Sequence, residues 1–261
     1  PYTEDDPFGE AFFKRISAEV MSGNGPDIII GKFGRMNANK MMRSGAFADL
    51  NEFLEADPDF ERSKYNGKVL EAGQVDGKQY IMPLTYKLPL VLTTQEMLDK
   101  TGFDISTADN YNAFLEECLD VQGKNIEGVP ELSMTMSLTP YLADAVDYDT
   151  REVKIDTPEN RETIRLNYEV VDVHIGEEGW GPSTGGKDDA LRVIENKTIF
   201  SVVHMPFALY FYSYRALKDV RTPVQAAVRD TEGRLMAEVG ESVAINANSP
   251  NKQNAYEFIK L

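Results

Sequence analysis

The sequence has few of the side chains on which many catalytic and metal sites depend. It contains one cysteine, Cys118, and two histidines, His174 and His204, which stand far apart. A single cysteine can form neither an internal disulfide nor a cysteine-based zinc site. The two histidines also lack the spacing of a helical zinc motif. We therefore expect no bound metal and no cofactor.

Long apolar runs and an excess of positive charge are missing too. No run of about 18 apolar residues occurs, so the sequence predicts no transmembrane helix. There are 27 Lys and Arg against 43 Asp and Glu, which gives a formal net charge of −16. Such a protein repels phosphate backbones and anionic membranes. The charge therefore argues against nucleic-acid binding and suits a neutral or cationic small ligand.

Two stretches approach known catalytic or nucleotide motifs without completing them. Residues 181–187 have the spacing of a P-loop, but Asp188 stands where that motif needs a magnesium-binding Ser or Thr. Ser201 lacks the flanking glycines of a nucleophile elbow. Carboxylates are plentiful, and a glycosidase pair of two carboxylates stays open on the sequence.

Helical and extended segments alternate along the chain, which predicts an α/β protein. Phe8, Phe12, Ile16 and Val20 recur every four residues and predict a helix over 8–21. Residues 28–30 are three isoleucines, apolar on both faces like a strand of a parallel sheet covered by helices. An Asp-Gly pair at 76–77 predicts a hairpin, and 81–94 is extended. Further helices are predicted near 37–43, 94–100, 109–121, 138–146, 157–173, 188–196 and after 249, and strands near 153–155, 199–203, 224–228 and 240–246.

Several segments, in this order, resemble the bacterial extracellular solute-binding proteins of the family that includes maltose-binding protein. Residues 25–30 resemble its Gly-Pro-Asp-Ile-Ile strand, and 44–50 the segment that ends in Asp-Leu. Residues 76–83 resemble its Gly-Lys-x-Tyr-x-x-Pro run before the crossing between lobes. Residues 244–252 are very similar to its strand and following helix start. The resemblance covers residues 18–261 and lacks the family's first strand-helix-strand and last helices, so the chain resembles a fragment.

The resemblance implies a two-lobed fold of the type II periplasmic-binding-protein class. Each lobe would be a mainly parallel sheet flanked by helices. The first lobe would contain residues 1–87 and 228–261, and the second 88–227. Hinges would lie near 84–92 and 224–242. In this family the ligand lies in the cleft between the lobes, and closure of the lobes accompanies binding.

The resemblance also nominates ligand-binding residues in both lobes. Aromatic rings fit this role because the C–H faces of sugars lie against them, and charged side chains bind the hydroxyls. The first lobe would use the loop after the isoleucine strand, the crossing segment and the Gly240-Glu241 pair, and the second lobe would supply further aromatic residues. The nominated residues are Phe33, Arg35, Tyr86, Lys87, Trp180, His204, Tyr210 (or Tyr212) and Glu241.

The function implied is binding without chemical conversion. The protein would capture a carbohydrate outside the cytoplasm, in the periplasm or anchored by lipid to the outer face of the membrane. It would act as a monomer and deliver the sugar to the permease of an ABC importer. A carbohydrate-active enzyme using paired carboxylates is the alternative. Binding of a peptide or polyamine in the same cleft is a third interpretation.

Overall fold

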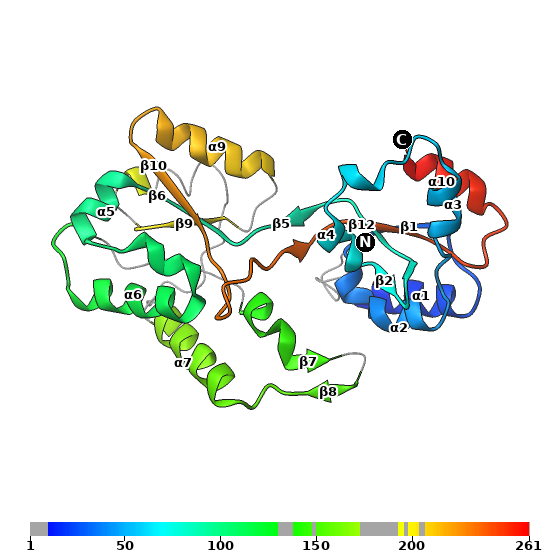
Figure 1. The fold of residues 1–261 in the computed structure, drawn as a ribbon, viewed down its shortest axis with the longest axis horizontal. Coiled ribbons are helices and arrows are strands. Elements are labelled where there is room, and N and C mark those ends of the chain that lie inside the picture. Colours follow the sequence, from blue (N-terminus) through cyan, green and yellow to red (C-terminus); the bar gives the residue numbers. More distant parts are fainter. Residues whose placement is uncertain are drawn as a thin grey trace. The chain divides into compact units, whose positions relative to one another are not determined.

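The structure is a computed structural model that describes residues 10–129, 138–147, 150–172, 193–195, 198–203 and 207–260. The chain forms two compact units of helices and sheets (Figure 1). Unit 1 contains Pro1–Tyr86 and Val239–Leu261, and unit 2 contains Lys87–Glu238. The second boundary, after Glu238, lies within the predicted hinge near 224–242. Val228, the first residue of the segment assigned to the first lobe on the sequence, is fully buried in the core of unit 2.

The sheet of unit 1 joins segments from both ends of the chain. Its order is β1 (Ile28–Gly31), β12 (Ser242–Ile245) and β4 (Met82–Pro83). Both pairings are antiparallel, with Ile29 opposite Ala244 and Met82 opposite Val243. The predicted parallel direction therefore does not hold here. Burial of a strand on both faces requires only that helices cover both faces, and it does not decide the direction of the neighbouring strand.

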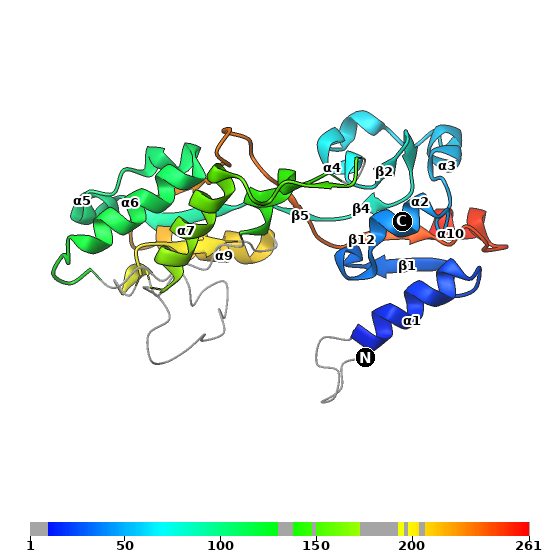
Figure 2. The same cartoon turned by 90° about the horizontal axis from the view of Figure 1, so that it is seen from below.

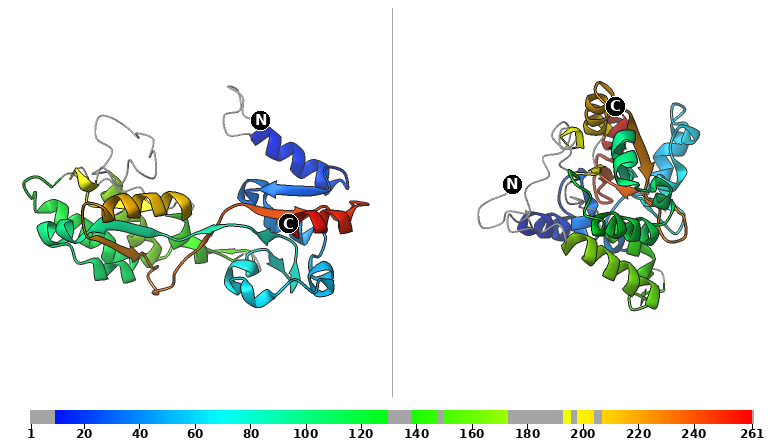
Figure 3. Two further views of the ribbon diagram at one scale, coloured as in Figure 1. Left: turned by 90° about the horizontal axis from the view of Figure 1, so that it is seen from above. Right: turned by 90° about the vertical axis from the view of Figure 1, so that its left-hand side faces the viewer.

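Each face of this sheet has its own hydrophobic cluster. Ile29 and Ala244 pack in one cluster with residues of α1 (Glu10–Met21) and α2 (Ala38–Arg43). Ile245 packs in the other with α3 (Asn51–Ala56) and α10 (Lys252–Lys260). Figures 2 and 3 show α1 on one side of the strands and the cyan helices, α3 and α4 (Gly67–Glu71), on the other. Unit 1 is thus a three-layer arrangement of helix, sheet and helix.

Hydrogen bonds between distant segments explain why the first and last motifs of the resemblance occur together. The Asp27 carboxylate accepts hydrogen bonds from Ser249 Oγ at 2.6 Å and Asn251 Nδ2 at 3.2 Å. The buried Asn246 donates through Nδ2 to the Asn24 carbonyl at 2.8 Å and the Pro26 carbonyl at 3.3 Å. These bonds fix the turn before β1 to the segment after β12. The two motifs form one structural unit.

Local turn chemistry in unit 1 follows the sequence closely. Asp76 and Gly77 have φ values of 51° and 76° and join β2 (Gln74–Val75) to β3 (Lys78–Gln79). Positive φ at both central residues is what a tight hairpin turn needs, so the predicted hairpin is confirmed. The remaining elements of unit 1 are two 3₁₀ helices, η1 (Phe33–Met36) and η2 (Arg62–Lys64).

The sheet of unit 2 also has helices on both faces. Its order is β10 (Pro223–Ala227), β6 (Leu90–Thr94) and β9 (Ser201–Val203), with both pairings antiparallel. Val91 packs in the larger core with α5 (Gln95–Thr101), α6 (Tyr111–Gly123) and α7 (Pro158–Asp172). Leu92, on the other face, packs against Leu217 of α9 (Phe207–Lys218). Figure 1 shows α9 on one side of this sheet and α6 and α7 on the other.

Short elements complete the described part of unit 2. The hairpin β7 (Val146–Asp147) and β8 (Glu152–Val153) follows the 3₁₀ helix η4 (Thr139–Ala145), where the sequence predicted an α-helix. A second 3₁₀ helix, η3 (Ile105–Asp109), precedes α6. The chain passes from one unit to the other within β5 (Tyr86–Lys87) and returns within β11 (Glu238–Val239), and these two strands form a two-stranded sheet.

Candidate functional site

The loop after β1 carries two of the nominated residues. Phe33 begins η1 and is only 6% exposed. Its ring packs edge to face against Phe47, with centroids 5.5 Å apart. The structure therefore places Phe33 in the core of unit 1 and not on a ligand-facing surface, because an apolar ring after a buried strand completes the hydrophobic layer. Arg35 lies in η1, and its side chain is outside the described residues.

The segment that leaves unit 1 brings two other nominated residues close in the fold. Tyr86 is 44% exposed, and Glu241 is exposed. The backbones that carry them are hydrogen-bonded, because the N–H groups of Leu84 and Thr85 both donate to the Glu241 carbonyl, at 2.9 and 3.1 Å. Residues 155 positions apart in sequence are thereby held at one place in unit 1. Spacing in the sequence could not have shown this.

A cavity of about 500 Å³ in unit 1 lies beside the segment that leaves this unit. Met82, Pro83, Leu84 and Tyr86 of that segment all line it, and so does Val243 of β12. Side chains of α3 and α10 line it as well. Lys87, the next residue of β5, is half-buried and belongs to unit 2. The cavity therefore brings Tyr86 beside α3 and α10, which stand far from it in the sequence.

The walls of this cavity are mainly apolar. Leu54, Leu70 and Val243 are buried in its lining. Phe60 and Tyr65 also line it and stack on each other, with ring centroids 5.1 Å apart. A sugar hydroxyl against the aliphatic wall would lose its hydrogen bonds to water without replacement. This part of the wall is therefore suited to an apolar group or the C–H face of a ring, while Asp57, Lys64 and Asn66 are among the polar residues of the lining.

An ion-pair network forms part of the polar lining. The Asp57 carboxylate accepts from Tyr256 Oη at 2.8 Å and from Lys260 Nζ at 2.8 Å, and Lys260 also contacts Asp59 at 3.3 Å. The hydrogen bond from Lys260 and the backbone N–H of Asp59 lower the pKa of Asp57 to about 2. Asp57 is thus ionised at neutral pH and ties α10 to the end of α3. It is a structural carboxylate in this geometry.

The nominated residues of unit 2 are only partly described. Tyr210 lies in α9, but its side chain is outside the described residues, as are Trp180 and His204 altogether. The alternative to Tyr210, Tyr212, is on the same helix and is exposed. Their mutual placement therefore stays a prediction.

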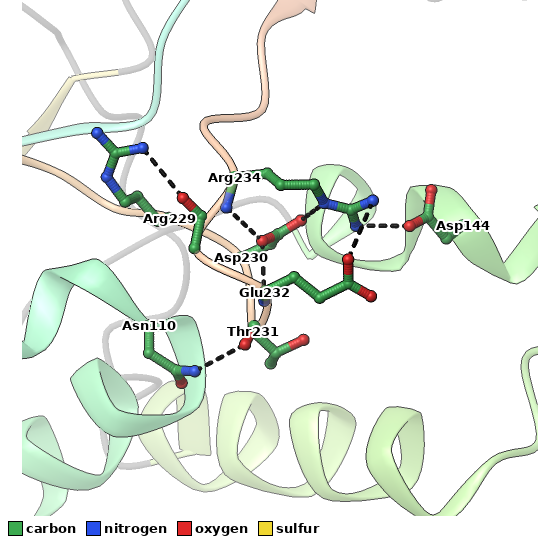
Figure 4. A network of polar contacts seen from close by, with 8 residues as sticks. Asn110, Asp144, Arg229, Asp230, Thr231, Glu232 and Arg234 are labelled. Carbon is green, nitrogen blue, oxygen red and sulfur yellow. Dashed lines mark hydrogen bonds and ion pairs between the residues drawn. The ribbon is translucent and has the colours of Figure 1, made fainter.

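A polar network in unit 2 was not expected from the sequence. The buried Asp230 carboxylate accepts from the Arg234 N–H at 2.7 Å and from Arg234 Nε at 2.7 Å, and Arg234 also pairs with Asp144 (Figure 4). Asn110 Nδ2 donates to the Thr231 carbonyl at 3.0 Å. These contacts fix the turn that precedes β11. The Asp-Thr-Glu-Gly run at 230–233 is the turn signal that could have indicated it.

The structure gives no indication of a metal centre or membrane span in its described part. No group of three or more His, Cys, Asp or Glu side chains among the described residues could hold a metal ion. In the same residues, no helix is both long and apolar enough to cross a membrane.

Comparison with known proteins gives a consistent family and fold. The family described as "Bacterial extracellular solute-binding protein" matches residues 8–261. A comparison with curated proteins finds no match. Many solved structures match. The ABC substrate-binding protein Lmo0181 of Listeria monocytogenes, in complex with cycloalternan, is 20% identical with a TM-score of 0.62, and the match covers 96% of this chain and 64% of that one.

Two further solved structures have the same fold. The GacH receptor of Streptomyces glaucescens GLA.O, solved unliganded and with acarbose, is 18% identical with a TM-score of 0.64, covering 97% and 65% of the two chains. A solute-binding protein of Thermotoga lettingae TMO, bound with α-D-tagatose, is 14% identical with a TM-score of 0.62, covering 95% and 65%. This chain therefore spans 64–65% of the length of these structures. Because the family matches almost the whole sequence, the chain belongs to the bacterial extracellular solute-binding proteins.

Proposed function

We propose that this chain binds a carbohydrate outside the cytoplasm and supplies it to the permease of an ABC importer. The observation that carries the proposal is the family match over residues 8–261. The bound sugars of the relatives, cycloalternan, acarbose and tagatose, support a carbohydrate over other solutes. Membership of a binding-protein family favours capture of the sugar as a monomer, without chemical conversion.

Within unit 1, we propose that the exposed residues of the crossing segments contact the ligand. Tyr86 offers a half-exposed ring, and Glu241 an exposed carboxylate. An aromatic face and a charged hydrogen-bonding group are the two elements that sugar recognition needs. Lys87, the next residue along the crossing segment, is half-buried and is a further proposed contact. The further proposed contacts are Arg35, Trp180, His204 and Tyr210.

A thermal-shift screen of mono- and oligosaccharides tests the proposal. A ligand that binds only the folded chain stabilises it by mass action, by about 2.7 kcal/mol at a hundredfold excess over Kd. We expect at least one sugar to raise the melting temperature in a concentration-dependent way, and no product to form on prolonged incubation. Absence of a shift with every sugar would contradict carbohydrate binding, and released product would favour the glycosidase alternative.

Tyr86→Ala tests the crossing segment, with Tyr168→Ala as a matched control. Tyr168 is another exposed tyrosine, on α7 of unit 2. We expect Tyr86→Ala to weaken binding of the identified sugar about tenfold, since aromatic contacts contribute roughly 1 kcal/mol or more beyond their buried area. Tyr168→Ala should leave the affinity unchanged. Equal affinity of both variants and the parent chain would remove Tyr86 from the site.

A further inference from the structure

The strand pairing of unit 1 becomes irregular next to the crossing. In β4 and β12, Pro83 lies opposite Ser242 in an ordinary antiparallel pair. At the next positions, Leu84 N and Thr85 N both donate to the same carbonyl, that of Glu241, at 2.9 and 3.1 Å. In a regular antiparallel ladder each carbonyl accepts from one opposite N–H. The N–H of Glu241 is therefore left without the main-chain carbonyl that would accept from it in a regular ladder.

The side chain of Thr85 supplies the missing acceptor. Glu241 N donates to Thr85 Oγ1 at 2.9 Å, and the neighbouring Gly240 N donates to the Thr85 carbonyl at 2.9 Å. A hydroxyl oxygen thus accepts the hydrogen bond that a main-chain carbonyl accepts in a regular sheet. Thr85 makes three bonds to this part of the opposite segment, through its N–H, its carbonyl and its side chain.

Gly240, which has no side chain, leaves space for the hydroxyl of Thr85. A Cβ atom added at Gly240 would lie 2.5 Å from Thr85 Oγ1, closer than real Cβ atoms approach other heavy atoms. The same Cβ would lie 3.7 Å from Thr85 Cβ and 3.5 Å from the Thr85 carbonyl oxygen, which are ordinary contacts. The clash is with the hydroxyl alone. The glycine is required here for space next to Thr85.

We propose that Thr85 is a positioning residue for ligand binding. Its Oγ1 atom fixes the two backbone segments that present Tyr86 and Glu241, the residues immediately after Thr85 and Gly240. This role has two steps. The first step, in which Thr85 fixes the backbone, concerns unit 1 alone and is measured without any ligand. The final step, in which the fixed backbone raises ligand affinity, rests on the proposed function, so failure of the proposed function is distinguishable from failure of the first step.

Amide hydrogen exchange of the whole 261-residue chain tests the first step. Thr85→Val keeps the shape of the side chain and removes the acceptor, whereas Thr85→Ser keeps the acceptor. We expect the Glu241 amide to exchange roughly three- to tenfold faster in Thr85→Val, as loss of one hydrogen bond implies, and at the parent rate in Thr85→Ser. The Val91 amide of β6 should be unchanged in both. An unchanged Glu241 amide in Thr85→Val would overturn the proposal.

A double-mutant comparison tests the steric relation of Thr85 and Gly240. We expect Gly240→Ala to destabilise β4 and β12 in the parent chain, as followed by exchange of their amides, and to cost much less in a Thr85→Ala background, because the clashing oxygen is then absent. Coupling of this kind is diagnostic of direct contact. Effects that simply add would show that the glycine is required for another reason, and would overturn this part of the proposal.

Ligand affinity tests the final step. With a sugar found in the screen, Thr85→Val should weaken binding severalfold, and Thr85→Ser should restore it to the parent value. Parent-like affinity in Thr85→Val, together with faster exchange of the Glu241 amide, would overturn the positioning role. If no sugar binds the parent chain, the proposed function fails, and the exchange and double-mutant results still decide whether Thr85 fixes this backbone.

Discussion

Two stacked tyrosines in the core of unit 2 allow a prediction with an internal control. The rings of Tyr111 and Tyr141 are parallel, with centroids 3.6 Å apart. Tyr111 Oη accepts a hydrogen bond from Asn167 Nδ2 at 2.7 Å. Tyr141 Oη is buried and has no hydrogen-bond partner among the described residues. Both hydroxyls are buried, and of the two only the Tyr111 hydroxyl has a hydrogen-bond partner among the described residues.

Substitution by phenylalanine should have opposite effects at the two positions. Each substitution keeps the ring and its stack and removes only the hydroxyl. Tyr111→Phe loses a hydrogen bond and should lower the free energy of unfolding by about 1 kcal/mol. A buried hydroxyl without a partner costs roughly 1–3 kcal/mol, so Tyr141→Phe should raise the free energy of unfolding by about 1 kcal/mol. The two variants should differ by about 2 kcal/mol.

Hydrogen exchange is the appropriate measurement, because two units can unfold separately and a single global transition is then not well defined. Peptides covering β6 and α6 report the opening free energy of the unit 2 core. If Tyr141→Phe lowers that free energy by as much as Tyr111→Phe, the Tyr141 hydroxyl has a partner in solution and the reasoning is refuted. A water molecule in the core would be the simplest such partner.

Three further predictions concern other parts of the molecule. The pKa of Asp57 lies near 2 in the folded chain, below the value of about 3.9 in an unfolded chain. The stability that Asp57 contributes is therefore present above pH 4 and is lost as the pH falls from 4 toward 2. Asp57→Asn should flatten this part of a plot of melting temperature against pH. Asn246→Ala removes the hydrogen bonds to the Asn24 and Pro26 carbonyls and should destabilise unit 1 by about 2–4 kcal/mol, as followed by exchange of β1 and β12; a loss under 1 kcal/mol would show that these bonds are replaced by water. Burial raises the pKa of the Cys118 thiol well above its ordinary value, so it should react with a thiol reagent only when unit 2 opens, and fast labelling of the native chain would contradict this placement.

Features set by neighbouring residues could be predicted from the sequence. Asp76 and Gly77 form the expected turn because their own backbone preferences decide it. Thr94 caps α5 by accepting from the Met97 N–H, and Gly102 ends it in a left-handed conformation, close to the predicted limits. Strand direction was not predictable, since Ile29 pairs with Ala244, a residue far along the chain. Apolar runs carry no information about which distant strand lies beside them.

In the candidate site, too, the sequence predicted some features and could not predict those that depend on distant residues. The family resemblance named Tyr86 and Glu241, but it could not show that Tyr86 lines a cavity together with residues of α3 and α10, which only folding brings beside it. It also named Phe33, which the fold uses in the core. Thr85 carries no sequence signal of its own. Its importance arises from the backbone of Glu241, which is brought beside it by folding.

The central position of β12 has a consequence for synthesis of the protein. Unit 2 is one continuous stretch, Lys87–Glu238, whereas the sheet of unit 1 needs Ser242–Ile245 between its two earlier strands. A chain made from its N-terminus therefore exposes β1 and β4 while all of unit 2 is still being translated. Unit 2 can reach its native contacts on the ribosome first. The isoleucines of β1 lack their pairing with β12 until about residue 245 emerges, so their apolar side chains and unpaired strand edge are open to wrong contacts in that interval.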